Sequence, residues 1–145
     1  NQVMEISNSR KKYFDNICKY IRKNSGIVII IDYGYLSPIK HSTLQSVRLH
    51  RASNILDHPG DQDITSLVNF MDLVEIAKQH NLNIFGPITQ QEFLKRNGIE
   101  ERKTKILSKA SEKQKHTIEK AYERLIADNQ MGNIFKCLVV STYEL

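Results

Sequence analysis

The chain has 145 residues and a mass of 16.8 kDa, which fits one domain and leaves little room for a second. Hydrophobic residues make up 40% of the sequence and charged residues 26%, proportions that exclude a disordered chain. The longest apolar run, Ile27 to Ile31, is too short to span a bilayer. The sequence opens on Asn1 without a charged segment followed by an apolar one, so we expect no secretory signal and a natural start upstream.

The charge pattern and the cysteine content limit the partners, the metal sites and the compartment that fit this chain. The formal net charge is +5, yet acidic and basic residues alternate through the densest stretch, Glu100 to Arg124. We interpret this stretch as a solvated helix face and predict no nucleic-acid partner. Cys18 and Cys137 are far apart and form no CxxC pair, which excludes a disulfide framework and a thiolate zinc site and fits a reducing compartment.

The first third of the chain predicts a helix and then a buried strand. Apolar residues recur at three- and four-residue steps between Arg10 and Asn24, and Gly26 suits the left-handed position after the helix. The β-branched run from Ile27 to Asp32 predicts a strand buried on both faces, as in parallel sheets. The segment Asp32–Tyr35 would then lie at the carboxyl edge of the sheet, where open α/β folds bind ligands.

The middle of the chain contains a long segment without periodicity. We interpret residues 36–62 as a loop. Because a loop of this length is uncommon inside a compact domain, we expect it to have a function. Asn69 then caps a predicted helix, and Leu82 to Phe85 predict a short strand that stops at Gly86-Pro87. Thr89 caps a further helix that ends at Asn97-Gly98.

The last third predicts two more helices and a final strand. The helices cover about 100–109 and 112–127, and the second has one apolar face, formed by Ile118, Ala121, Tyr122, Leu125 and Ile126. Met131-Gly132 predicts a turn into the strand 134–141. The alternation of helices and apolar strands indicates an α/β class. Three strands make a thin sheet, so we expect the chain to be the latter part of a larger α/β domain.

Several phrases in this order resemble one family. They are IDYGY at 31–35, PGDQDIT at 59–65, VNF at 68–70, GPITQQEFLKRNGI at 86–99 with Arg102, and MGNIFK at 131–136. Together they are similar to the MidA-like class I S-adenosylmethionine-dependent methyltransferases. The mitochondrial members of that family include an arginine methyltransferase that assists assembly of respiratory complex I.

The resemblance implies the C-terminal part of a Rossmann-like methyltransferase fold. Residues 27–32 would be its fifth strand, 82–86 its sixth and 134–141 its antiparallel seventh, with a helical insertion at about 89–128. The glycine-rich turn and the acidic residue that hold the cofactor, S-adenosylmethionine, would lie upstream of this chain. The chain alone is therefore not expected to be catalytically competent.

The resemblance also implies partners and compartment. It predicts a protein substrate methylated on arginine, including a respiratory complex I subunit, and a bacterial cytoplasm or mitochondrial matrix. The alternative is a non-catalytic protein-interaction part of the same family. In either case the incomplete sheet predicts self-association or pairing with the missing N-terminal portion.

Six residues are candidates for the site, each with a structural alternative. Asp32 would form a wall of the cleft or cap local amides, and Tyr33 and Tyr35 would line an acceptor pocket or pack at the strand end. Asp63 and Thr65 would fold over the cleft or cap a turn. Gln90 would contact substrate or hydrogen-bond within its own loop. The spacing of His41, His50 and His58 lacks the i, i+4 pairing of helical metal ligands, so no metal site is predicted.

Overall fold

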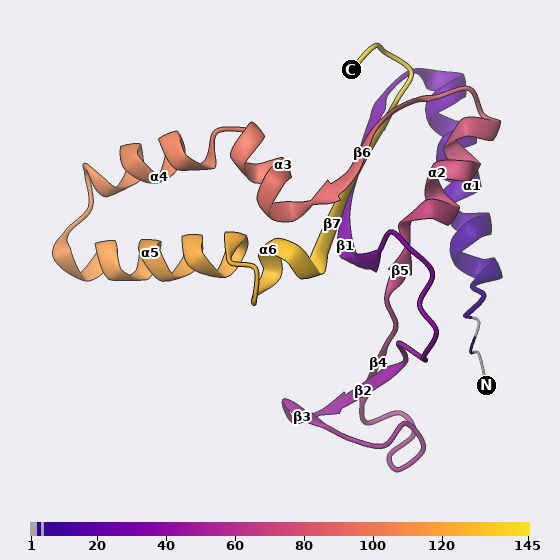
Figure 1. Ribbon diagram of the computed structural model, residues 1–145, viewed down its shortest axis with the longest axis horizontal. Coiled ribbons are helices and arrows are strands. Elements are labelled where there is room, and N and C mark those ends of the chain that lie inside the picture. The colour runs from indigo at the N-terminus through magenta and orange to yellow at the C-terminus, as the bar shows by residue number, and fades with distance from the viewer. Residues whose placement is uncertain (1–2, 4) are drawn as a thin grey trace.

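The computed structural model describes residues 3 and 5–145, and its main body is a four-stranded sheet (Figure 1). The strand order is β5-β1-β7-β6. The strands are β1 (Ile27–Tyr35), β5 (Val68–Asn69), β6 (Asn83–Thr89) and β7 (Phe135–Ser141). β7 lies antiparallel between β1 and β6, and its register with β1 runs from Ile27 opposite Ser141 to Tyr33 opposite Phe135. The predicted antiparallel final strand is confirmed.

Two helices cover one face of this sheet. α1 (Asn8–Asn24) and α2 (Phe70–Gln79) lie side by side in Figure 1. Periodic apolar residues explain both helices, because one face of each enters the core. The core is formed by Phe14, Cys18, Ile21, Phe70, Leu73, Val74, Ala77, Leu138 and Val140, with Val28 and Ile30 of β1 packed against it. Tyr13, which the helical spacing placed with this stripe, is instead 71% exposed.

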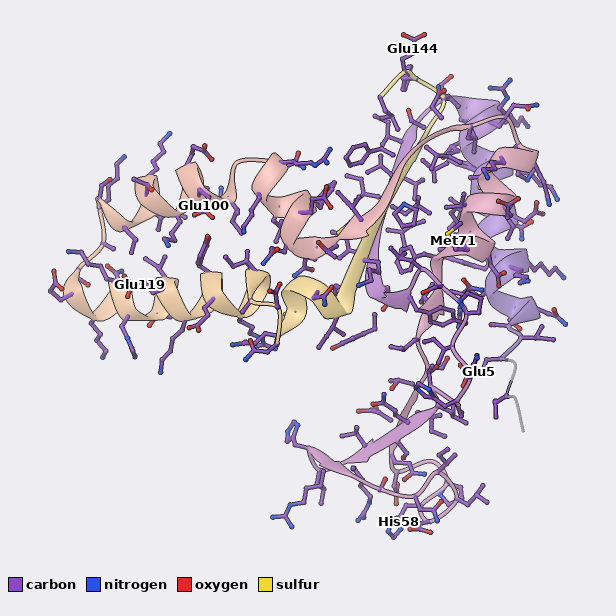
Figure 2. The ribbon with its side chains drawn as sticks, viewed as in Figure 1. Glu5, His58, Met71, Glu100, Glu119 and Glu144 are labelled. Carbon is purple, nitrogen blue, oxygen red and sulfur yellow. The ribbon has the colours of Figure 1, made fainter. Side chains whose placement is uncertain are left out.

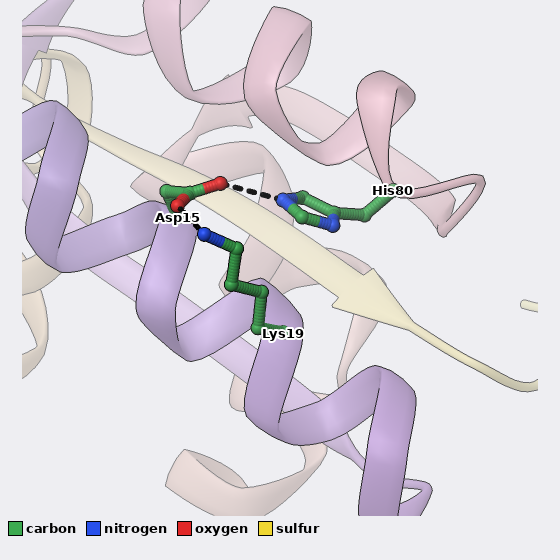
Figure 3. Close-up of polar contacts among 3 residues, drawn as sticks. All are labelled: Asp15, Lys19 and His80. Atoms are coloured by element: carbon green, nitrogen blue, oxygen red, sulfur yellow. Dashed lines mark hydrogen bonds and ion pairs between the residues drawn. The ribbon is translucent and has the colours of Figure 1, made fainter.

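A polar contact also joins the two helices. Asp15 of α1 accepts a 2.6 Å hydrogen bond from Lys19 and lies 2.7 Å from Nε2 of His80, the residue that follows α2 (Figure 3). The hydrogen bond from Lys19, followed by that from His80, lowers the pKa of Asp15. The contact therefore fixes α1 against the C-terminal end of α2 when Asp15 is ionised.

The opposite face of β1 is uncovered. Ile27, Ile29 and Ile31 are 53%, 55% and 44% exposed, because consecutive strand residues point to opposite faces and α1 and α2 cover only one. On the uncovered side, α3 (Gln90–Arg96) packs against β6 and β7. The prediction of a strand buried on both faces is therefore wrong for this chain.

Two local predictions about backbone geometry are also wrong. The left-handed residue after α1 is Ser25, with φ of 58°, and Gly26 does not adopt a positive φ. β6 does not stop at Gly86-Pro87 but continues to Thr89, with a register shift between Phe85 and Ile88. Gly86 makes this irregularity possible, because its φ is 87°.

The segment predicted as a long loop, residues 36–62, contains two strands of a second sheet, and the third strand directly follows it. β2 (Gln45–Arg48) pairs antiparallel with β3 (Arg51–Ala52) and with β4 (Asp63–Thr65). The turn between β2 and β3 places Leu49 and His50 in the left-handed region, with φ of 50° and 61°. This small sheet projects below the main sheet in Figure 1.

A helical arm connects β6 to β7 (Figure 1). It comprises α3, α4 (Ile99–Leu107), α5 (Glu112–Ile126) and α6 (Met131–Ile134), the last where a simple turn was predicted. The predicted caps are confirmed: Thr89 accepts from the backbone of Glu92, and at the start of α2 Asn69 accepts from Met71. No residue of α4 or α5 is buried, so the predicted apolar face of α5 is not part of the core.

Within the described part of the chain, none of the helices has both the length and the apolar character needed to cross a membrane.

Candidate functional site

A cleft of about 580 Å³ lies at the carboxyl end of β1. β5 pairs with β1 only here, with Gly34 opposite Val68 and Tyr35 opposite Asn69. The N-terminus of α2 follows directly, and the segment 36–40 forms the opposite wall. The polar residues that line the cleft are Glu5, Lys11, Tyr35, Ser37, Lys40, Asn69 and Asp72. This is the edge of the sheet at which open α/β folds bind ligands.

Tyr35 is the predicted site residue that the structure places in this cleft. Burial is the main cause that raises the pKa of its hydroxyl, and the negative charges of Glu5 and Asp72 raise it further. The phenol therefore stays protonated at neutral pH. It can donate a hydrogen bond to a bound molecule.

Glu5 was not predicted, and it is the most strongly held carboxylate of the cleft. It accepts hydrogen bonds from the Thr43 backbone N–H at 2.7 Å, the Thr43 hydroxyl at 2.5 Å and the Ser42 hydroxyl at 2.9 Å. The bond from the Thr43 hydroxyl is the largest of the causes that lower the pKa of Glu5. The Thr43 hydroxyl oxygen also accepts from the backbone N–H of Leu67 at 3.0 Å, so this network fastens the wall of the cleft to the chain before β5.

Asp72 is the second carboxylate of the cleft and lies in the first turn of α2. Its Oδ2 is 3.1 Å from Nζ of Lys11, and the Asp72 side chain remains 30% exposed. A carboxylate in this position is favoured by the positive end of the helix dipole. Unlike Glu5, Asp72 is held by a single flexible lysine, which a stronger cationic ligand can displace.

Asp32 and Tyr33 lie just before the cleft and are not among its lining residues. As neighbours on a strand, they project to opposite faces of the sheet. Asp32 accepts a 2.8 Å hydrogen bond from the Tyr33 backbone N–H, which is the local capping role considered for it. The Tyr33 ring stacks on Phe135 with 4.1 Å between centroids. Each side chain therefore has a local structural partner, the alternative considered for it beside a role in the site.

The other candidates lie on different elements. Asp63 and Thr65 are exposed residues of β4 and pair with Val47 and Gln45 of β2, so they belong to the small sheet and are not among the cleft residues. Gln90 is 4% exposed, and its amide donates to the carbonyl oxygen of Leu125 at 2.8 Å. Its amide nitrogen thus binds within the helical arm.

The two cysteines are buried and do not line the cleft. Cys18 and Cys137 are fully buried, and burial raises the pKa of each thiol to about 11. Among residues 3 and 5–145, no group of three or more His, Cys, Asp or Glu side chains is arranged to hold a metal ion.

Comparison with known proteins decides the family. Residues 1–88 match the family described as "Putative S-adenosyl-L-methionine-dependent methyltransferase". The chain belongs to this family. The resemblance to MidA-like methyltransferases is therefore confirmed.

Curated relatives of the chain carry a more specific name. The chain is 32% identical over 135 residues to the mitochondrial protein arginine methyltransferase NDUFAF7 of Xenopus tropicalis, covering 92% of this chain and 31% of that protein. The human protein of the same name is 30% identical over 131 residues, covering 90% of this chain and 29% of its own length. The chain thus spans about a third of the length of these relatives.

Solved structures confirm the fold. A crystal structure of an uncharacterized COG1565 superfamily protein from Burkholderia thailandensis superposes with a TM-score of 0.80 at 26% identity, covering 94% of this chain and 37% of that one. A second member from the same organism, bound to S-adenosyl-homocysteine, gives a TM-score of 0.78 at 24% identity over 94% of this chain and 36% of its own. The α/β methyltransferase fold class is therefore confirmed.

Proposed function

We propose that this chain forms the acceptor side of an S-adenosylmethionine-dependent methyltransferase that methylates arginine in a protein. The observation that carries the proposal is the cleft of Tyr35 and Asp72 at the carboxyl end of β1, in a chain of this methyltransferase family. The name of the curated relatives supports arginine in a protein as the acceptor. We extend the proposal to a respiratory complex I subunit as substrate, and to the mitochondrial matrix or bacterial cytoplasm as compartment.

The charges of the cleft fit a guanidinium group. A carboxylate can receive two parallel hydrogen bonds from arginine, which fixes the orientation of the side chain. Asp72 is the carboxylate available for this, because Glu5 is already held by Thr43 and Ser42. An incoming arginine would displace Lys11, and the Tyr35 hydroxyl lines the same cleft. Such positioning is the main contribution that a protein makes to methyl transfer between two bound groups.

Among the described residues, those at the carboxyl edge of β1 do not form a cradle for the cofactor. Such a cradle requires a glycine whose open space lets the backbone approach the ligand. Gly34 lies at the right edge of the sheet, but the ring of Phe70 and the carbonyl of Val68 fill the space beside it. Asp32 accepts a hydrogen bond from the Tyr33 backbone N–H through one carboxylate oxygen and is not among the residues that line the cleft. We therefore place S-adenosylmethionine mainly on residues outside this chain and derive no step through it.

The uncovered edge of β1 supports a sheet that continues. Within the described residues, only Gly34 and Tyr35 of β1 pair on the side away from β7, so Ile27 to Tyr33 present free backbone groups there. The exposed Ile27, Ile29 and Ile31 lie on the same strand. We propose that another strand pairs here, from the rest of the domain or from a second copy of the chain.

Two measurements test the proposal. In calorimetry, the chain of 145 residues is expected to give no heat with S-adenosylhomocysteine, and saturable micromolar binding would contradict the location of the cofactor outside it. The encoded protein in full is then assayed for transfer of a labelled methyl group, and the labelled residue is identified by mass spectrometry. Label on arginine is expected, and Asp72→Asn should reduce the rate while Asp57→Asn, in an exposed turn, should not.

Contrary outcomes separate the alternatives. Label on a residue other than arginine would contradict the proposal that arginine is the methyl acceptor. No transfer by the encoded protein would contradict catalysis and favour the non-catalytic interaction role.

A further inference from the structure

The two long helices of the arm form a hairpin whose inner seam is open. α4 and α5 project away from the sheet (Figure 2), and α3 and α6 contact them at the base of the hairpin. Between them lies a groove with two adjoining parts, of about 770 Å³ toward the tip and 390 Å³ toward the base. Arg102, Ile106 and Ile118 line both parts, so the groove is continuous.

The groove has an apolar floor. Leu94, Ile106, Ile118 and Leu125 line it, and Ile106 and Leu125 are 40% and 36% exposed. An apolar seam at helical spacing stabilises a helix only when another surface covers it. In this chain no residue of either helix is buried. The seam therefore fits a ligand that brings apolar side chains.

The charged side chains that line the groove are all basic. Its lining contains five cations and no carboxylate; the cations are Arg102, Lys103, Lys105, Lys109 and Lys113. The acidic residues of the hairpin do not line the groove, and two are occupied: Glu112 pairs with Lys115, and Glu100 accepts from the Tyr122 hydroxyl. Basic and acidic residues alternate along this part of the sequence, but only the basic ones line the groove. Of the five cations, only Lys103 has a described partner, the Tyr122 ring at 3.9 Å.

We propose that this groove binds an acidic amphipathic helix of a partner protein. A helix supplies apolar side chains along one face and carboxylates beside them, which matches an apolar floor between basic walls. A nucleic acid would leave the isoleucines and leucines uncovered. The one aromatic ring of the lining, Tyr122, is already engaged by Lys103 and Glu100, so it offers no free face for a base. The proposal does not depend on methyltransferase activity.

Fluorescence anisotropy with defined probes tests this inference on the full chain. The probe is a labelled peptide of about 16 residues, long enough to follow the hairpin, with leucines at i, i+3, i+4 and i+7 and glutamates between them. A matched peptide has lysine in place of glutamate. A single-stranded oligothymidylate and vesicles of phosphatidylcholine with phosphatidylglycerol represent the other classes of ligand.

Saturable binding of the glutamate peptide is expected, and it should weaken as salt rises. Lys105→Glu with Lys109→Glu should weaken it about tenfold or more, because both cations become repulsive. Ile118→Asp should weaken it comparably by placing a charge in the apolar floor. The matched control is Lys12→Glu with Lys23→Glu on α1, which changes the net charge equally and should change the affinity by less than about twofold.

Several outcomes would overturn the proposal. Equal weakening by the α1 control pair would mean that general charge attraction, and not the groove, binds the peptide. Equal binding of the lysine peptide would contradict the role of the cations. Binding of the oligonucleotide or the vesicles without the glutamate peptide would assign the groove to those ligands. Circular dichroism of each variant shows whether a loss of binding reflects a loss of helix.

Discussion

The side-chain amide of Gln90 donates a 2.8 Å hydrogen bond to the backbone carbonyl of Leu125, 35 residues further along the chain. Gln90 begins α3 and Leu125 lies in the last turn of α5, so this bond fastens the end of the hairpin to its base. The adjacent Gln91 repeats the arrangement with the carbonyl of Ile126. The last carbonyls of a helix have no hydrogen-bond donor within the helix, and the amides of these two glutamines supply that donor.

Gln90→Leu should destabilise the chain. The substitution keeps the size of the buried side chain but leaves the Leu125 carbonyl unpaired, which costs about 1–3 kcal/mol of unfolding free energy. Urea unfolding followed by circular dichroism measures this value. Gln79→Leu, at an exposed position of α2, is the matched control and should change stability by less than about 0.5 kcal/mol. Equal stabilities of the two variants would contradict a stabilising role for the hydrogen bond from Gln90 to Leu125.

Gly34→Ala should destabilise the chain, whereas Gly26→Ala should not. A Cβ at Gly34 would overlap the ring of Phe70, which is fully buried, and lie 2.6 Å from the Val68 carbonyl oxygen. Such overpacking costs about 1–3 kcal/mol. A Cβ at Gly26 would meet only Ile21, at an ordinary 3.7 Å. Melting temperatures of the two variants provide the comparison, and similar values would contradict the close approach at Gly34.

Glu5 should make stability depend on acid pH. Its pKa in the folded chain lies below the ordinary 4.5, so the ionised form is the one that the fold stabilises. This stabilisation is complete above pH 4.5 and is lost as the pH falls through the lower folded pKa. Thr43→Val removes the largest cause of the shift and should reduce this pH dependence. Unfolding free energies between pH 3 and pH 6 measure the effect, and an unchanged slope would contradict it.

Sequence patterns correctly predicted the elements that depend on a run of apolar residues or on contacts between residues close in sequence. The run from Ile27 to Ile31 identified β1, and Asn69 and Thr89 marked the starts of α2 and α3 because each cap acts within three residues. β6 was ended too early because Gly86-Pro87 normally stops a strand, whereas here it forms an irregularity inside one. The short strands β2 and β3 have too few residues to show an alternating pattern.

The cleft was only partly predictable for a related reason. Tyr35 could be expected there because it ends a strand. Glu5 could not, because its partner Thr43 lies 38 residues away and neither residue belongs to a recognisable motif. Gln90 was a candidate for contact with substrate, but its observed partner is likewise distant in sequence. Hydrogen bonds of this range follow from the fold and leave no local signal.

The uncovered strand edge gives the last prediction, which concerns association. Along Ile27 to Tyr33, β1 presents an unpaired edge within the described structure and a face with Ile29 55% exposed, and such edges pair with other chains. The chain should therefore self-associate as its concentration rises in sedimentation velocity. Ile29→Lys should reduce association by placing a charge on this face. Ile64→Lys, on β4 and 53% exposed, is the matched control and should leave association unchanged. A monodisperse monomer at high concentration, or equal effects of both lysines, would contradict association through β1.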